Sequence, residues 1–187
     1  MSEEIAEVIS ASLAEDGVIV KDENAHGILM ERGFGDKDNG KLKLKHYEAL
    51  YLLNIGKLQV TKGKRAISFD QLAAHALGRD PNGWTGFLIY RDLRSRGYVA
   101  KEGFGFGYDF RVYERGEYGT KPAKYVVFGL NEGMEMPLAE LNKSVNEIRR
   151  MGKEAIVAVI ERRGEVIYYR LAKARFKQND RHPSQSD

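Results

Sequence analysis

The chain has 187 residues, enough for one large domain or two small ones, and its 30 basic and 27 acidic residues leave a net charge of +3. It contains no cysteine, which excludes disulfides, thiolate metal sites and cysteine nucleophiles. No apolar run approaches the roughly 20 residues that span a bilayer, and the acidic start MSEEIAEV is unlike a secretory or transit peptide. We therefore expect a cytoplasmic protein without a membrane partner, whose small positive charge permits a local basic face.

The first elements alternate between strands and helices. An Asp-Gly pair at residues 16–17 between two apolar runs predicts a hairpin. The glycines and charges of residues 31–41 (ERGFGDKDNGK) predict a loop. Apolar residues at helical spacing within residues 44–56 predict a helix that ends at its final glycine, and a short strand follows at residues 58–60.

A second short helix and a domain boundary follow. Ser68 is the predicted N-cap of the helix and Gly78 its C′ residue. Residues 79–84 (RDPNGW) interrupt the helical pattern with a proline and a glycine, which marks a boundary. Thr85 is the predicted cap of the next helix, which Gly97 ends.

The remaining elements are mostly strands. A strand at residues 98–101 leads into the glycine-rich residues 103–107 (GFGFG), which lack both the Lys-Ser/Thr of a phosphate loop and a following helix and therefore predict a connector. Residues 109–113 alternate between polar and apolar side chains, as a half-buried strand does, and residues 124–130 form another strand. Leucine, valine and isoleucine spaced within residues 138–148 predict a helix.

Two final strands, residues 154–161 and 165–171, are joined by an Arg-Arg-Gly turn. Together these elements predict an α/β (α+β) chain with two small domains, each of which contains both helices and strands. We expect a small N-terminal α/β domain at residues 1–82 and a second small α/β domain at residues 83–187, with a polar tail from about residue 174.

Tyr113 is the first candidate for chemistry. On the alternation of its strand, Phe110 and Val112 face a core, whereas Arg111 and Tyr113 share the opposite face. A strand tyrosine usually serves packing, but one that lies among cations is also a candidate general base.

Metal chemistry has little support in the sequence, and we expect neither a metal site nor a cofactor. No histidine pair has helical ligand spacing, and no HExxH motif is present. No spacing singles out a carboxylate pair. The four histidines are His26, His46, His75 and His182.

Three clusters of basic side chains favour an anionic partner. Each alone is explained by solvation or by the helix macrodipole, but three in one domain favour an anionic partner. The clusters are Arg91, Arg94 and Arg96; Arg149, Arg150 and Lys153; and Arg162 and Arg163.

Residues 90–116 (YRDLRSRGYVAKEGFGFGYDFRVYERG) resemble the core signature of archaeal tRNA-splicing endonucleases. Residues 46–60 look like that family's N-terminal helix and strand, and residues 155–171 like its closing hairpin. The resemblance implies a two-domain subunit whose C-terminal domain has a nuclease-like mixed sheet. It also implies cleavage of precursor tRNA at bulge-helix-bulge sites, which leaves a 2′,3′-cyclic phosphate and a 5′-hydroxyl without a metal.

In the mechanism that the resemblance implies, a tyrosine activates the 2′-hydroxyl, a histidine protonates the leaving oxygen and a lysine stabilises developing charge. Tyr113 matches the tyrosine and Lys153 the lysine. The histidine position is occupied by Pro122, or by Ala123 if the match slips by one residue. Neither side chain can donate a proton.

Two further departures concern RNA and assembly. The family's helix before the lysine carries an arginine that grips the bulge, and this chain has Asn146 near that position. Arg149 and Arg150, together with Arg111, are then the expected RNA contacts. The family's acidic turn between the last strands, which docks into a basic pocket of a partner, here carries two arginines within residues 161–165 (ERRGE).

These departures favour a structural, non-catalytic subunit that works in a heterotetramer with a homologous catalytic subunit. One alternative is a catalytic-type subunit whose histidine has been replaced. A second is a stand-alone RNA-binding module, and a third is a metal-dependent DNA endonuclease, which would need clustered acidic ligands. The sequence leaves open whether the isolated chain is an enzyme.

Overall fold

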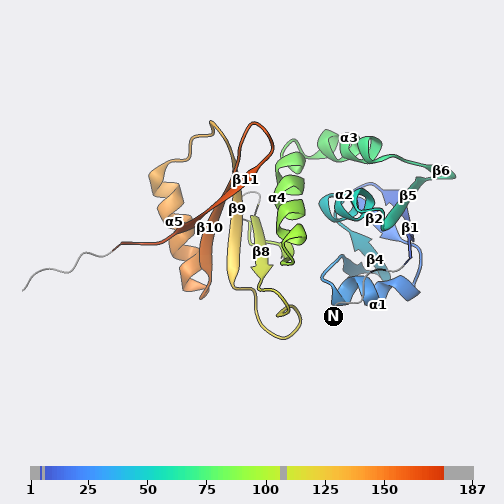
Figure 1. Ribbon diagram of the computed structural model, residues 1–187, viewed down its shortest axis with the longest axis horizontal. Coiled ribbons are helices and arrows are strands. Elements are labelled where there is room, and N and C mark those ends of the chain that lie inside the picture. Colours follow the sequence, from blue (N-terminus) through green and yellow to red (C-terminus); the bar gives the residue numbers. More distant parts are fainter. Residues whose placement is uncertain (1–4, 6, 106–108, 175–187) are drawn as a thin grey trace, which may run out of the picture.

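The computed structural model describes residue 5, residues 7–105 and residues 109–174. Its strands form two mixed sheets, one built from the N-terminal part of the chain and one from the C-terminal part (Figure 1). The elements in chain order are β1 (Ile9–Ala14), β2 (Gly17–Val20), α1 (Asn24–Glu31), β3 (Asp36–Asp38), β4 (Lys41–Leu44), α2 (His46–Asn54), β5 (Leu58–Lys62), β6 (Arg65–Ala66), α3 (Phe69–Arg79), α4 (Gly83–Ser95), β7 (Val99–Glu102), β8 (Asp109–Tyr113), β9 (Tyr125–Asn131), α5 (Leu138–Arg150), β10 (Glu154–Ile160) and β11 (Val166–Leu171).

The N-terminal sheet has six strands in the order β3-β4-β2-β1-β5-β6. The predicted hairpin is confirmed, because β1 and β2 pair antiparallel with Ala14 opposite Gly17. β1 also pairs parallel with β5, so the sheet is mixed. Apolar residues of β1 alternate with polar ones, and Ile9 and Ala11 are buried on the side that faces the helices.

The loop predicted at residues 31–41 is wrong in part. β3 and β4 form an antiparallel hairpin there, closed by Asn39 and Gly40 with φ angles of 50° and 78°. Positive φ at both central residues is typical of the turns that fit the twist of a hairpin. All three residues of β3 are exposed and none is apolar, so the sequence has no apolar alternation that would predict this edge strand.

Two helices of the N-terminal part, α2 and α3, keep their predicted places but not all their predicted ends, whereas α1 was missed from the sequence. α2 begins at His46, so the first residue of the predicted helix, Leu44, belongs to β4 and Lys45 is the N-cap. The Ser68 cap is confirmed, since the Ser68 hydroxyl accepts the Gln71 backbone N–H at 3.2 Å. Gly78 lies inside α3, which ends one residue later at Arg79, so it is not the C′ residue.

α4 lies between the two sheets, with α2 on one side and the C-terminal strands on the other (Figure 1). It begins at Gly83, so Thr85 is not its cap; the Thr85 hydroxyl donates instead to Asn131 Oδ1 of β9 at 2.9 Å. Gly97, with φ of 86°, ends the helix as expected. The buried side chains of α4 belong to one core that is continuous from the N-terminal sheet to the C-terminal sheet.

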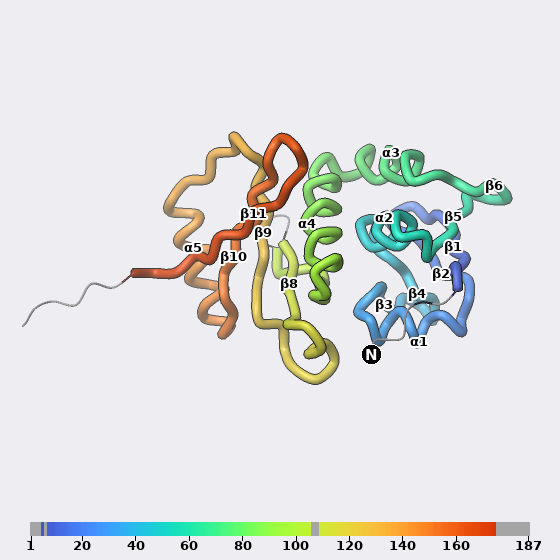
Figure 2. Tube along the Cα trace, in the orientation of Figure 1, coloured from blue at the N-terminus to red at the C-terminus, as the bar shows by residue number. Residues whose placement is uncertain are grey.

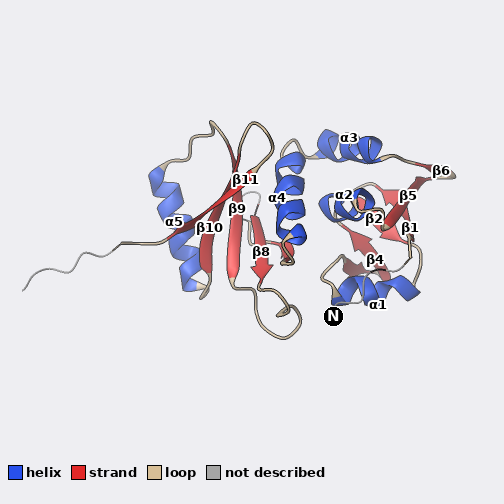
Figure 3. Cartoon of the chain, viewed as in Figure 1, coloured by secondary structure: helices blue, strands red, loops and turns tan. Residues whose placement is uncertain are grey.

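The C-terminal sheet has five strands in the order β11-β10-β9-β8-β7. β9 and β10 run parallel and the other neighbours antiparallel, so this sheet is mixed as well and the predicted fold class is confirmed. α4 covers one face and α5 the other (Figure 3). Because helices cover both faces, the central strands are apolar throughout rather than alternating.

The glycine-rich connector joins β7 to β8 as expected, although its residues 106 and 107 lie outside the described part. A Cβ on Gly103 would overlap the carboxylate of Asp109. That carboxylate accepts the backbone N–H of Phe104 at 2.6 Å and of Gly105 at 3.2 Å. The described part of the connector thus wraps its own aspartate, which accounts for the glycine.

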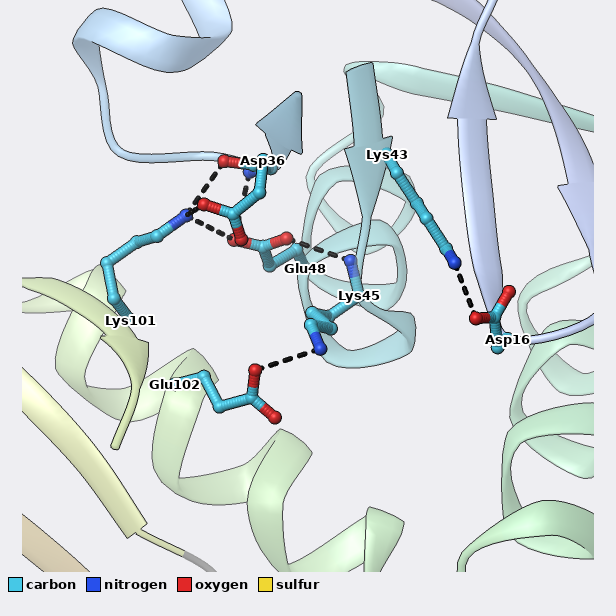
Figure 4. A network of polar contacts seen from close by, with 8 residues as sticks. Asp16, Asp36, Lys43, Lys45, Glu48, Lys101 and Glu102 are labelled. Carbon is cyan, nitrogen blue, oxygen red and sulfur yellow. Dashed lines mark hydrogen bonds and ion pairs between the residues drawn. The ribbon is translucent and has the colours of Figure 1, made fainter. Parts of the chain in front are cut away.

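A buried ionic network ties the two sheets together (Figure 4). Lys101 of β7 donates from Nζ to the Gly35 carbonyl at 2.8 Å and lies 3.1 Å from Asp36 Oδ1 and 3.7 Å from Glu48 Oε1. Glu48 Oε1 and Oε2 accept the backbone N–H groups of Gly35 and Lys45 at 3.0 and 2.9 Å. The Glu48 side chain is 1% exposed and that of Lys101 6%, so burial raises the pKa of Glu48 while Lys101 opposes the shift.

A histidine pair makes the contact between α2 and α3 sensitive to acid. The rings of His46 and His75 lie 5.4 Å apart, and both Nε2 atoms are buried without a hydrogen-bond partner among the described residues. Burial, then the nearby charges of His75 and Arg79, lower the pKa of His46 from its ordinary 6.5. As the pH falls, His46 is therefore protonated in the unfolded chain before it is protonated in the folded one. The folded state loses stability as the pH falls below the ordinary pKa of 6.5.

We expect the thermal unfolding midpoint to fall between about pH 7.5 and about pH 5.5, and the fall to be smaller in His46→Gln. Differential scanning calorimetry across this range checks the result. An equal fall in both proteins would contradict the assignment of His46 as the proton acceptor.

Candidate functional site

The strand order brings three segments together at one end of the C-terminal sheet. β8 runs antiparallel to β9, and β9 runs parallel to β10, so the last residue of β8 meets the first residues of the other two strands. The Lys124 N–H donates to the Val112 carbonyl at 3.0 Å, and the Glu154 N–H donates to the Lys124 carbonyl at 3.0 Å. Tyr113, residues 122–123 and Lys153 thus lie on three neighbouring segments of this sheet end.

Lys153 contacts the position that the sequence match assigns to the missing histidine. Its Nζ donates to the Ala123 carbonyl at 2.7 Å and lies 6.0 Å from the centre of the Phe104 ring. Ala123 is buried, whereas Pro122 is exposed. The ammonium group is therefore held at the sheet end, next to a backbone carbonyl where the match expects an acid.

Tyr113 is half-buried on the face opposite Phe110 and Val112, as its alternation predicts. Its ring packs edge-on against Tyr118 at 4.9 Å between centroids. Arg115, one of the cations close to it in sequence, lies over the ring of Tyr98 instead, at 5.0 Å. Tyr113 thus sits at a sheet end beside a second tyrosine.

The predicted RNA contacts occupy two places. Arg111 is half-buried on β8, and its Nε atom is buried without a hydrogen-bond partner among the described residues. Arg149 and Arg150 are exposed at the end of α5, where they line an open depression of about 410 Å³ with Asn146 and Lys173. Lys173 was missed from the sequence, since a lone lysine after the last strand carries no pattern.

The described histidines all lie away from this sheet end. His26 is in α1, where its Nε2 lies 3.2 Å from the Val20 carbonyl, and His46 and His75 pair between α2 and α3. His182 lies outside the described residues. Within the described ranges, no group of three or more histidine, aspartate or glutamate side chains could hold a metal ion. Nor is any helix there long and apolar enough to cross a membrane.

Comparison with known proteins decides the family. A model of the tRNA intron endonuclease N-terminal domain matches residues 9–73, and a model of the tRNA intron endonuclease catalytic C-terminal domain matches residues 84–168. A tRNA-splicing endonuclease of Thermococcus gammatolerans is 34% identical over 165 residues, which cover 88% of this chain and 97% of that relative. The chain belongs to the tRNA-splicing endonuclease family.

Other tRNA-splicing endonucleases show how far this membership extends. The one from Methanococcus vannielii is 30% identical over 164 residues, 87% of this chain and 93% of the relative. The one from Methanococcoides burtonii is 27% identical over 178 residues, which cover 95% of this chain but 50% of the relative. The resemblance of residues 90–116 is confirmed for the family, whose substrate is precursor tRNA.

Proposed function

We propose that the chain is the structural, non-catalytic subunit of a tRNA-splicing endonuclease and works in a heterotetramer with a homologous catalytic subunit. The holoenzyme cleaves precursor tRNA introns at bulge-helix-bulge sites and leaves a 2′,3′-cyclic phosphate and a 5′-hydroxyl. In this proposal residues 1–82 form the N-terminal domain and residues 83–187 the nuclease-like domain. RNA contacts come from Arg111, Arg149 and Arg150.

The observation that carries the proposal is the side chain at the expected acid position. Attack by the 2′-hydroxyl needs a group that takes its proton and a second group that protonates the leaving 5′-oxygen. Tyr113 and Lys153 have the chemistry of a base and of a charge stabiliser. Residues 122 and 123, beside Lys153, are a proline and an alanine, whose side chains have no acidic proton to donate.

The distribution of charge supports a heteromeric assembly. An open pocket of about 340 Å³ between the two sheets is lined by Arg32, Arg94 and Glu31 together with aromatic side chains. Its charged side chains leave an excess of one cation, which suits an acidic segment of a partner. The turn between β10 and β11 presents Arg162 and Arg163 at its exposed tip. Glu161 and Glu165 flank these arginines, and Arg162 Nε lies 3.7 Å from Glu132 Oε2, so the turn has no net negative charge to offer such a pocket. A homologous subunit with an acidic turn would therefore complement the pocket better than a second copy of this chain.

Co-expression with a catalytic relative from the same genome tests the proposal. We expect the two chains to co-purify as a hetero-oligomer, and the complex to cleave a bulge-helix-bulge RNA with the same products in the presence and absence of EDTA. A Glu substitution at both turn arginines (Arg162→Glu with Arg163→Glu) is the matched variant, and we expect it to increase self-association. A chain that forms an active homotetramer without a partner would contradict the proposal.

One observation favours a catalytic-type subunit as the second candidate. Tyr113 and Lys153 both persist at the same sheet end, where a subunit without turnover has no chemical need of them. On that reading the partner supplies the acid. A stand-alone RNA-binding module would instead bind precursor tRNA and leave the cleavage rate of every added partner unchanged.

A further inference from the structure

A further pocket lies on the face of the C-terminal sheet that is opposite Tyr113. It has a volume of about 210 Å³. Val112 lines it, and the alternation of β8 directs Tyr113 to the opposite face. We call it the tyrosine pocket; its lining residues are Leu93, Arg96, Tyr98, Val112, Tyr125, Val127, Ile156 and Tyr168.

Two of its aromatic rings are held in place by their hydroxyls. Tyr168 donates to Asp92 Oδ2 at 2.8 Å, and Tyr125 donates to Glu114 Oε2 at 2.8 Å. Burial and the hydrogen bond to Asp92 raise the pKa of Tyr168, so its hydroxyl stays protonated and keeps donating. The rings are thus fixed before any ligand arrives, which lowers the entropy cost of binding.

Each of the three tyrosines has a cation beside it. The Arg96 guanidinium lies 5.8 Å from the centre of the Tyr168 ring, and Arg115 lies 5.0 Å from that of Tyr98. The Lys124 ammonium lies 5.0 Å from the centre of Tyr125. All three cationic residues are exposed, so they form a positive rim around a floor of aromatic and aliphatic side chains.

We propose that the tyrosine pocket binds one unstacked base of an RNA strand, while Arg96, Arg115 and Lys124 contact the flanking phosphates. Single-stranded RNA is bound in this way, by aromatic rings that stack on bases and by basic groups that follow the backbone. The inference rests on the proposed function only for the choice of RNA as the partner. It adds an RNA contact on a sheet face that carries none of the candidate catalytic residues.

The charge of the rim favours RNA over an apolar side chain of a protein partner. Asp92 and Glu114 lie at the same rim, but each already pairs with a rim cation, Arg96 at 2.8 Å and Lys124 at 3.1 Å. Arg115 has no carboxylate partner among the described ion pairs. One cation therefore remains in excess beside the aromatic floor, which complements a nucleotide and not a hydrocarbon.

The test measures binding by the purified chain and needs no cleavage. Fluorescence anisotropy compares a labelled single-stranded oligo(A) of about eight nucleotides with an abasic strand of the same length and charge. We expect the native chain to bind oligo(A) about tenfold more tightly than the abasic strand. Tyr168→Leu should remove this preference, and Tyr168→Phe, which keeps the ring, should retain most of it. Tyr169→Leu, on the opposite face of the same strand, is the matched control.

Two further variants keep the test decisive if Tyr168→Leu does not fold. Ile156→Trp fills the pocket from β10 and should also remove the preference for oligo(A). Arg115→Gln should weaken the binding of both strands and reduce the slope of log affinity against log salt concentration by about one. Lys64→Gln, on the N-terminal sheet, should change neither quantity.

Equal binding of the two strands by the native chain would overturn the inference. So would a preference that survives both Tyr168→Leu and Ile156→Trp. If Tyr168→Leu and Ile156→Trp abolish co-purification with the catalytic relative but leave RNA binding intact, the pocket binds a protein partner and the inference is overturned. Failure of the cleavage proposal leaves these binding results unchanged, so the two proposals fail separately.

Discussion

Lys101→Met is expected to destabilise the protein by about 3–5 kcal/mol, because it removes the cation from a buried pair and leaves the partner carboxylate behind. Glu48 is 1% exposed, and its carboxylate accepts the Lys45 N–H at the start of α2 and the Gly35 N–H just before β3 (Figure 4). Lys101 lies on β7 of the other sheet, so the loss falls on the contact between the two halves of the chain. Urea unfolding at neutral pH measures the change.

The neighbouring pair of Lys45 and Glu102 supplies a matched control. Its Nζ–Oε2 distance is 2.9 Å, but its side chains are 39% and 68% exposed. Lys45→Met should therefore cost at most about 1 kcal/mol. The double variant Lys101→Met with Glu48→Gln should recover part of the loss, since it removes the unpaired charge. If Lys101→Met lowers the free energy of unfolding as little as Lys45→Met does, the buried network does not stabilise the contact between the two sheets.

The pH dependence of Lys101→Met provides a second check. Without the lysine, the folded-state pKa of Glu48 rises further above its ordinary value of 4.5, because burial is then less opposed. A carboxyl with a raised folded pKa costs stability above its unfolded pKa and nothing below it. The destabilisation should therefore shrink as the pH falls toward about 4.5.

The second large effect concerns cleavage. The isolated chain should cut a bulge-helix-bulge RNA about 10²–10⁴-fold more slowly than its complex with a catalytic relative, the range that loss of a general acid spans. The physical reason is that Pro122 and Ala123 supply no proton beside Lys153. Single-turnover assays with enzyme in excess separate this chemical loss from weak RNA binding.

The matched control is the catalytic relative with its own histidine replaced by alanine. Mixed with the native chain, it should be as slow as the isolated chain. Cleavage by the isolated chain within about tenfold of the complex would show that it holds a complete site.

The sequence predicts most of the architecture where an element has an internal pattern. The alternation of residues 109–113 placed β8 and its two faces correctly, and the serine of the α3 cap was identified from its place before the helical residues. β3 has three exposed, charged residues and takes its strand conformation from pairing with β4, so its own composition indicated a loop. Only the Asn-Gly pair at residues 39–40 announced the turn.

The site was predictable in part. Similarity to the family pointed to Tyr113 and Lys153, but the proximity of Lys153 to Ala123 depends on the parallel pairing of β9 with β10, which no local pattern encodes. The tie between Lys101 and Glu48 joins residues far apart in the chain. The path of the chain from α3 into α4, and from there into the second sheet, is what brings such pairs together (Figure 2).

The cleavage rate of a reconstituted complex that carries Tyr113→Phe in this chain tests the central proposal most directly. The substitution removes one hydroxyl and keeps the ring that packs on Tyr118 at 4.9 Å, so the fold should not change. If the chain is the structural subunit, the rate should stay within about twofold of the native complex, whereas the equivalent substitution in the catalytic relative should lower it by about a hundredfold or more. A hundredfold loss from Tyr113→Phe in this chain would instead show that its sheet end is catalytic and that the proton reaches the leaving oxygen from a partner.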